Sequence, residues 1–415
     1  MPNRIISKVS RPPLDLVDII HEVAKIAKIE GIKFSIGFGS EDEMDFILGD
    51  VYKVTIRGYR DGQRLKRQFV IKWIADPERR YTFRNLYIRD HAFYNYVAPK
   101  LIEIQRRFKI VEGLKISFPN CVFSRKEKHK ECMVFTCILS QGYGFSNRVH
   151  SIDVEHCSLV IKCLAKLHGL FYVLKHTDER QSNFIKMIYH SDVQYSGKIK
   201  PTSNCIFNFY NESVSVVKDP MAKNKLNNCA EDIYNILCKC VIPDRFSTIC
   251  HADCWSNNVC FKYNGTKPID VILVDYQISR FASPVTDLSY FLYMSTDEEL
   301  LENHYERLIN LYYKTLSAVL RQCNVNVNEI YPEDIFQEHL KKYSVLGLIE
   351  ALISMKIITA ESEDAIEMAK MRYDIVKELA CDSESQNESL FVKRVNGVVN
   401  DFFKRGYSLD AVLEK

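Results

Sequence analysis

Three side chains that carry oxygen donors are spaced so that a single hairpin would bring them together. Asp253 and Asn258 precede a strand-like run at 259–263, and Asp275 follows a second such run at 269–274. An Asn-Gly dipeptide lies between the two runs, which is a strong signal for a tight antiparallel hairpin. In such a hairpin the start of the first strand lies beside the end of the second. We therefore expect Asp253, Asn258 and Asp275 to converge at one end of the hairpin.

The chemistry of this set suits a phosphoryl-transfer site. Oxygen atoms are the ligands that Mg²⁺ prefers in proteins, often together with substrate phosphates. His251, Asp253 and Asn258 stand in the order H-x-D-x-x-x-x-N, the spacing at which a kinase catalytic loop places its base and a Mg²⁺ ligand. We therefore predict that Asp253 is the catalytic base and that Asn258 and Asp275 bind the metal.

Simpler roles exist for several residues of this segment. Asp253 and Asn258 could be ordinary turn residues, and His251 is predicted to be a hydrogen-bonded loop residue rather than a base. Asp287 could be only a helix cap, but we favour a role in which its carboxylate accepts backbone N–H groups of the catalytic loop. A thiolate zinc site is disfavoured because the paired C-x₂-C spacing is missing. The residues concerned are Cys250, His251, Cys254 and Cys260.

A second pair of charges lies far upstream, on segments that otherwise read as buried. Lys72 is the only charge in the strand-like run 69–74, and Asp90 lies on the apolar stripe of a helix expected over 83–97. A lone charge on a buried face needs a partner or must become neutral. We therefore predict that Lys72 and Asp90 form an ion pair, as a kinase strand lysine does with a carboxylate on the next helix. The alternatives are an aspartate at a helix edge and a lysine at a strand edge.

The elements around these residues predict a bilobal α+β fold. A strand-rich region comes first, and the chain after Asp153 reads as mostly helical except at 259–274. We place the boundary at the flexible stretch Gly142–Gly144 and just before it, with an N-terminal lobe at 1–138 and a helical C-terminal lobe at 139–415. The predicted N-terminal elements are a helix over 14–30, a hairpin of 51–57 and 69–74 around an Asp-Gly turn, the helix 83–97 that stops at Pro99, and a strand over 132–139.

Composition narrows the function classes further. The formal net charge is +3 with 56 Lys and Arg against 53 Asp and Glu, which does not favour nucleic-acid binding. The 14 cysteines are scattered, so we expect free thiols in a reducing compartment. No signal peptide and no apolar run of about 18 residues are recognised. We therefore predict a cytoplasmic protein that needs no nucleic acid, membrane or obligate protein partner.

At this point the chain resembles the insect ecdysteroid kinase-like (CHK kinase-like) family, related to choline kinase and the aminoglycoside phosphotransferases. The similarity runs from about residue 30 to the C-terminus and is most specific over 250–293. The motifs that carry it are Phe69–Ile74, Phe93-Tyr94 before Pro99, Leu164–His168, Cys250–Asn258, Asp275–Ser283 and Asp287–Phe291.

The resemblance implies a protein-kinase-like fold and a reaction. The ATP γ-phosphoryl group would pass to a hydroxyl of an ecdysteroid-like or other small alcohol, with Mg²⁺ as cofactor. Lys72 would clamp the ATP phosphates, and Asp90 would take the place of a family glutamate. The phosphate-covering loop has Gly49 as its one glycine. Backbone groups of Phe135, Thr136, Cys137 and Ile138 would hold adenine. The acceptor pocket would come from helical segments at 153–245 and 300–380.

Two other functions stay open. One is a kinase of the same fold with a polar acceptor, such as choline or an amino sugar. The other is a pseudokinase that binds a nucleotide or steroid with little turnover, which the single glycine of the loop and the short Asp90 side chain favour. A protein kinase is disfavoured because Asp287 follows Asp275 too closely for an activation segment, and no A-P-E sequence follows.

Overall fold

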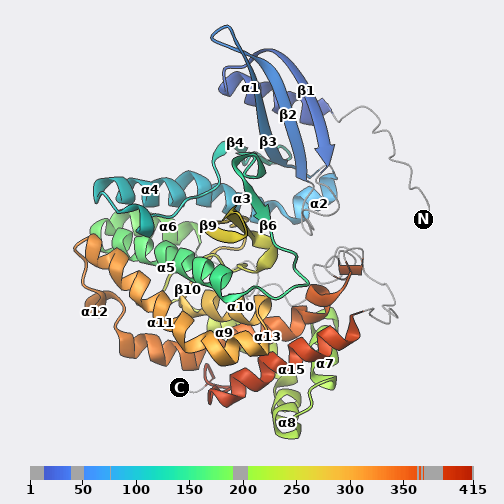
Figure 1. Ribbon diagram of the computed structural model, residues 1–415, viewed down its shortest axis with the longest axis vertical. Coiled ribbons are helices and arrows are strands. Elements are labelled where there is room, and N and C mark those ends of the chain that lie inside the picture. Colours follow the sequence, from blue (N-terminus) through green and yellow to red (C-terminus); the bar gives the residue numbers. More distant parts are fainter. Residues whose placement is uncertain are drawn as a thin grey trace.

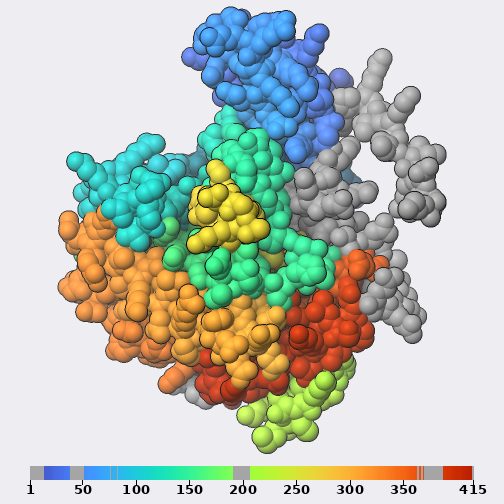
Figure 2. Space-filling model, viewed as in Figure 1, coloured from blue at the N-terminus to red at the C-terminus, as the bar shows by residue number. Residues whose placement is uncertain are grey.

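The chain folds into an antiparallel sheet at one end and a larger, mainly helical body (Figure 1). Figure 2 shows the first strands projecting from the rest of the molecule. The α+β fold expected from the sequence is confirmed. The computed structural model describes residues 14–38, 51–74, 76–189, 204–361, 364, 365, 368 and 387–413.

The N-terminal sheet has five antiparallel strands in the order β1-β2-β3-β5-β4. The predicted β2–β3 hairpin is present and turns at Asp61 and Gly62, whose φ angles of 51° and 75° suit a tight primed turn. The strands are β1 (Glu30–Phe38), β2 (Val51–Arg60), β3 (Gln63–Lys72), β4 (Cys121–Arg125) and β5 (Cys132–Thr136).

Helix α1 (Leu14–Ile26) covers one face of this sheet (Figure 1). Its buried side chains recur at helical spacing and pack with those of the strands in one apolar cluster. Ile71 belongs to that cluster, and successive strand residues point to opposite faces. Lys72 is therefore turned to the other face, away from α1. The cluster includes Leu16, Ile19, Ile20, Val23, Val54, Ile56, Phe69 and Ile71.

The helix predicted over 83–97 does not stop at Pro99. It passes from α3 into a π-helical turn, in which the Ala98 N–H bonds to the Phe93 carbonyl, and continues as α4. Pro99 falls in the first turn of α4, where a missing N–H and a fixed φ are tolerated. The elements here are α2 (Pro77–Thr82), α3 (Arg84–Ala92), η1 (Phe93–Val97), α4 (Ala98–Arg107) and η2 (Glu112–Leu114).

The connection between the two parts is more structured than the sequence suggests. The strand expected over 132–139 ends at Thr136, and a single turn, η3 (Leu139–Gln141), follows. The stretch expected to be flexible contributes to β6 (Tyr143–Phe145), which pairs with a later strand. Gly142 precedes it with a φ of 88°. The lobe boundary at 138/139 stays a prediction.

The second strand-rich segment contains the predicted Asn-Gly hairpin. Val259 pairs with Leu273, and Gly265 adopts a φ of 62° at the turn. The two strands join β6 in a three-stranded sheet, and two short strands pair separately. Their bounds are β7 (Thr248–Cys250), β8 (Val259–Asn264), β9 (Lys267–Leu273) and β10 (Arg280–Ala282).

The remaining elements form the helical body and share one large apolar core. They are α5 (Val154–Thr177), α6 (Glu179–Ile188), α7 (Asn204–Ser215), α8 (Pro220–Cys229), η4 (Ala230–Asp232), α9 (Ile233–Cys240), η5 (Ser256–Asn258), α10 (Val285–Ser295), α11 (Glu298–Gln322), α12 (Val327–Ile330), α13 (Glu333–Thr359) and α15 (Glu388–Lys404).

Two helices of this body have unusual surroundings. Helix α5 is long and apolar enough to cross a membrane, contrary to the expectation of no such run, but 78% of that stretch is buried within the fold. Its apolarity is thus that of a core helix. Helix α10 lies so close to α13 that a Cβ atom on Gly347 would fall 2.4 Å from the Ser289 carbonyl carbon. Only glycine fits there, and the contact holds α10 in place.

Candidate active site

Asp253 and Asn258 contact each other directly. The Asn258 Nδ2 donates to the backbone carbonyl of Asp253 and to its Oδ2, both at 2.9 Å. The amide nitrogen is therefore committed to the loop, and the Oδ1 of Asn258 is the atom left for a cation. Asp253 is partly exposed and Asn258 is buried. The loop thus presents a carboxylate and an amide oxygen side by side.

The hairpin brings Asp275 to the same end, as predicted. The backbone N–H of Val274 donates to the Asn258 carbonyl at 3.0 Å. The His251 Nε2 lies 3.0 Å from the Val274 carbonyl, and its Nδ1 accepts the Asp253 N–H at 3.2 Å. His251 therefore uses both ring nitrogens to tie the loop to the hairpin, and its Nε2 must carry the proton. These contacts match the structural role expected for it.

Asp287, at the start of α10, holds the loop backbone in the predicted way. Its Oδ2 accepts the N–H of His251 at 2.7 Å and its Oδ1 that of Ala252 at 2.8 Å. Ala252 has a φ of 71°, which is rare for a residue with a Cβ atom. Arg280 also donates to the Ala252 carbonyl at 3.2 Å. The strained residue is thus fixed on both sides, as such residues must be.

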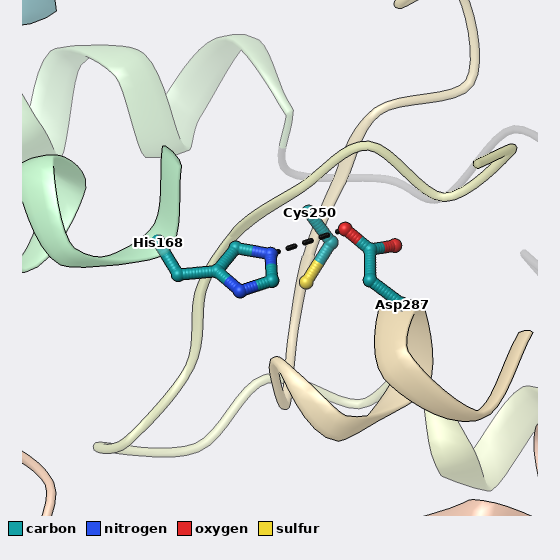
Figure 3. Close-up of side chains that lie close together, drawn as sticks. All are labelled: His168, Cys250 and Asp287. Atoms are coloured by element: carbon teal, nitrogen blue, oxygen red, sulfur yellow. Dashed lines mark hydrogen bonds and ion pairs between the residues drawn. The ribbon is translucent and has the colours of Figure 1, made fainter. Parts of the chain in front are cut away.

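A buried histidine supports Asp287 from behind (Figure 3). The His168 Nε2 lies 3.1 Å from the Asp287 Oδ2, and its Nδ1 lies 2.9 Å from the Tyr312 hydroxyl. Burial alone would raise the pKa of Asp287, but the His168 hydrogen bond and the nearby His251 and Ala252 N–H lower it below its usual range. The carboxylate therefore stays charged inside the core.

Cys250 lies beside this pair, and ligand-type atoms of Cys250, His168 and Asp287 fall within 4.8 Å of one another (Figure 3). Hydrogen bonds already engage both histidine nitrogens and both carboxylate oxygens. Burial, followed by the Asp287 charge, raises the pKa of the Cys250 thiol well above its ordinary value. Because the histidine and carboxylate atoms are already hydrogen-bonded within the fold, we interpret this cluster as a structural network.

Lys72 lies between two carboxylates from different parts of the chain. Its Nζ is 2.8 Å from the Asp90 Oδ2 and 2.8 Å from the Asp275 Oδ1. The ion pair with Asp90 is therefore formed, although the aspartate is a short side chain. Burial alone would lower the pKa of Lys72, but the charges of Asp275 and Asp90 raise it. Lys72 stays an ammonium group that connects β3, α3 and the hairpin.

Aromatic packing reinforces this connection. Tyr276 stacks on Phe93, with ring centroids 3.6 Å apart and planes at 10°. Tyr276 also contacts the catalytic loop, because the centroid of the His251 ring lies 4.5 Å from that of the Tyr276 ring. Tyr276 is fully buried. The residue after Asp275 therefore couples the helix that carries Asp90 to the loop that carries Asp253.

Of the backbone N–H groups at 135–138, which are predicted to hold adenine, two already donate hydrogen bonds within the fold. The N–H of Thr136 donates to Asn120 and that of Cys137 to Gln68, both at 3.0 Å. Among the described residues, the Ile138 N–H has no hydrogen-bond partner. The Ile138 side chain joins an apolar cluster with Cys260 and Ile272 of the hairpin. Gly49, predicted to act on the phosphates, lies outside the described residues.

Sequence reasoning missed three polar residues at the site. The Tyr290 hydroxyl donates to the Asp253 Oδ1 at 2.8 Å, and the Gln277 amide donates to the Asp275 Oδ2 at 3.1 Å. The third is His168, and all three stand inside motifs of the family resemblance without a role assigned to them. Tyr290 stands three positions after Asp287, and residues so spaced share a helix face. That spacing was the signal that could have found it.

A family model decides the assignment. It matches residues 43–325, more than half of the chain. The chain belongs to the ecdysteroid kinase-like family. The matched part begins just before β2 and ends after α11, so this family region contains Lys72, Asp253, Asn258 and Asp275. No curated protein matches the sequence significantly.

Solved structures with a similar course of the chain include two small-molecule phosphotransferases. A macrolide 2′-phosphotransferase type I is 12% identical with a TM-score of 0.40, and the match covers 88% of this chain and 99% of that one. The choline kinase LicA from Streptococcus pneumoniae is 11% identical with a TM-score of 0.34, covering 93% and 99%. With such low scores, the family match carries the assignment.

Membership of the ecdysteroid kinase-like family also settles the broad class of activity. The chain is a phosphotransferase that acts on hydroxyl groups, as expected from its sequence. It is a small-molecule kinase and uses a nucleotide as phosphoryl donor.

Proposed function

We propose that this protein transfers the ATP γ-phosphoryl group to a hydroxyl of an ecdysteroid-like small alcohol. The observation that carries the proposal is the convergence of Asp253, Asn258 and Asp275 at one end of the β8–β9 hairpin, with Lys72 2.8 Å from Asp275. These are the base, metal-ligand and phosphate-binding groups that phosphoryl transfer needs. They come from three separate stretches of sequence.

The donor set fits Mg²⁺. Asp275 offers a carboxylate and Asn258 its Oδ1, since hydrogen bonds to Asp253 hold its Nδ2. Hard oxygen atoms of this kind suit Mg²⁺, which typically takes one or two carboxylates plus substrate phosphates. When bound, the ion would neutralise charge on the phosphates. The protein side chains then have to orient the acceptor and remove its proton.

Asp253 would do so. In the proposed step the acceptor O–H bond breaks, its proton passes to the Asp253 carboxylate, and the acceptor oxygen bonds to the γ-phosphorus as the bond to ADP breaks. The Lys72 ammonium group would exchange its contact with Asp275 for one with the phosphates and would keep its contact with Asp90. The 2.8 Å contact to Asp90 supports an active enzyme over a pseudokinase, because the shorter carboxylate still reaches Lys72.

Adenine would lie beside Ile138, at the start of η3. The Ile138 N–H is the candidate donor to the base, because the N–H groups of Thr136 and Cys137 are engaged elsewhere. The apolar cluster of Ile138, Cys260 and Ile272 offers a surface for the ring. We further propose that the enzyme works in the cytoplasm and takes a free small molecule as acceptor.

The test is incubation with labelled ATP, Mg²⁺ and a panel of ecdysteroids, choline and amino sugars. Transfer to an ecdysteroid supports the proposal, and transfer only to choline or an amino sugar contradicts the substrate class. Asp253→Ala should lower turnover about 10²–10⁴-fold, the usual range for a positioned general base, with ATP binding nearly unchanged. Near wild-type turnover in this variant would show that the loop is not catalytic.

The metal assignment has its own measurement. Asn258→Ala and Asp275→Ala should each weaken Mg²⁺-dependent nucleotide binding, because each variant removes one oxygen ligand. The effect of Asp275→Ala should be larger, since that side chain carries a charge. Calorimetric titration with ATP, with and without Mg²⁺, checks this. Equal ATP affinity of the wild type in both conditions would contradict the metal site.

A further inference from the structure

Tyr290 contacts the proposed base from a helix that already holds the catalytic loop. Its hydroxyl donates to the Asp253 Oδ1 at 2.8 Å, while the Asn258 Nδ2 donates to the Oδ2 at 2.9 Å. Each carboxylate oxygen of Asp253 thus has its own donor. Two donors on opposite oxygens fix both the position and the plane of the carboxylate. Tyr290 itself is only 5% exposed, so its ring has little freedom.

The helix that carries Tyr290 is well placed for this task. Asp287 and Tyr290 lie three residues apart on α10 and therefore on the same face. Asp287 binds the loop backbone at His251 and Ala252, and Tyr290 binds the side chain two residues further on. Helix α10 also packs closely against α13 at Gly347. One rigid helix thus fixes both the backbone and the side chain of the base.

We infer that Tyr290 is a positioning residue that holds the Asp253 carboxylate in the orientation that meets the acceptor hydroxyl. This inference rests on the proposed function. A carboxylate oxygen has two lone pairs, so an acceptor can bind Asp253 while Tyr290 and Asn258 remain in place. Tyr290 donates a hydrogen bond and transfers no proton. In this role Tyr290 acts through the Asp253 carboxylate that its hydroxyl contacts.

A matched control, Tyr293, lies three positions further along the same helix. The Tyr293 hydroxyl is also buried and also donates to a carboxylate, that of Asp401 at 3.2 Å. Tyr293→Phe therefore removes the same kind of hydrogen bond away from the catalytic loop. A loss that follows from packing alone should be similar in the two variants.

The kinetic test compares Tyr290→Phe with that control. Misplacing a reacting group by a fraction of its contact distance lowers rates strongly, so Tyr290→Phe should lower kcat about 10- to 100-fold and leave the KM for ATP within about twofold. Tyr293→Phe should keep kcat within about twofold. In an Asp253→Ala background, Tyr290→Phe should change the residual rate less than twofold. An equal loss in both backgrounds would overturn the inference.

A second measurement needs no acceptor. Urea unfolding midpoints of the wild type, Asp253→Ala, Tyr290→Phe and the double variant form a cycle that isolates the contact between the two side chains. The shift caused by Tyr290→Phe should shrink in the Asp253→Ala background, and additive shifts would contradict the contact. If the wild type phosphorylates no member of the panel, the proposed function fails, and this cycle alone decides whether Tyr290 holds Asp253.

Discussion

The two charged clusters of the site are built in different ways. Around Lys72 the contacts are ion pairs between side chains of β3, α3 and the hairpin, and the Lys72 and Asp275 side chains are 17% and 26% exposed. Around Asp287 the contacts are hydrogen bonds to backbone N–H groups and to a histidine, and the Asp287 and His168 side chains are 1% and 0% exposed.

The difference follows from what each cluster has to do. In the proposed function Lys72 exchanges its contact with Asp275 for the phosphates, which suits two partly exposed side chains, while Asp90 stays buried. The Asp287 cluster must keep a strained loop in one conformation, so it is buried and fully hydrogen-bonded. Partly exposed ion pairs contribute modestly to stability, whereas breaking a buried network strands polar groups. Substitutions in the two clusters should therefore differ in kind.

The largest effect is expected at Asp287. Asp287→Ala strands the N–H groups of His251 and Ala252 together with the His168 ring, so it should lower the free energy of unfolding by about 3–5 kcal/mol. Turnover should fall with it, because the loop loses its support. A comparable carboxylate for a control is Asp219, which caps α8 by accepting hydrogen bonds from the N–H groups of Met221 and Ala222.

Asp219→Ala is the control for that experiment. It removes a carboxylate with two similar backbone contacts at an exposed helix end and should lower the free energy of unfolding by only about 1 kcal/mol. Urea unfolding followed by circular dichroism measures both. Equal losses in the two variants would show that burial of the Asp287 network adds nothing.

A smaller loss of stability is expected at Lys72. Lys72→Met leaves Asp90 buried without its cation, and this should lower the free energy of unfolding by about 2–3 kcal/mol. Nucleotide affinity should fall as well, because the phosphates lose their cation. Lys66 lies on the same strand and is exposed, so Lys66→Met should leave both quantities nearly unchanged. Unaltered stability in Lys72→Met would contradict the pairing.

Lengthening the partner of Lys72 tests how closely α3 approaches the strand. The 2.8 Å contact already fills the gap, and Asp90 is 1% exposed. Asp90→Glu should therefore overfill the site, gain no activity and lose about 1–2 kcal/mol of unfolding free energy. Asp18→Glu on the exposed face of α1 is the control. Higher turnover in Asp90→Glu would show that the pair is too loose.

The smallest effect is a change in acid sensitivity. Because the pKa of Asp287 is lowered in the folded protein, the native state holds fewer protons here than the unfolded chain. The resulting stabilisation is present above the ordinary carboxyl pKa and is lost as the pH falls through the native value. Asp287→Asn should therefore lose less stability than the wild type between pH 5 and pH 3. Urea unfolding of the wild type and of Asp287→Asn at pH 5 and at pH 3 checks the direction of this difference in stability.

Much of the site was predictable because its signals are local. The H-x-D-x-x-x-x-N spacing and the Asn-Gly turn lie within the 15 residues 251–265, and hairpin geometry alone brings Asn258 beside Val274. Lys72 and Asp90 were predictable because a charge on an apolar face needs a partner. The stop at Pro99 was wrong, because a π-helical turn let the proline fall in the first turn of a new helix.

The sequence by itself thus determined the α+β class, the hairpin that gathers the oxygen ligands and the pairing of Lys72 with Asp90. Only the tertiary structure decided what holds these groups in place. Tyr290 reaches Asp253 because α10 packs against α13, and His168 reaches Asp287 from α5, 119 positions away in sequence. The spacing of Tyr290 after Asp287 indicates a shared helix face, but which groups the two side chains meet, and the His168 contact as a whole, depend on how helices pack in the core.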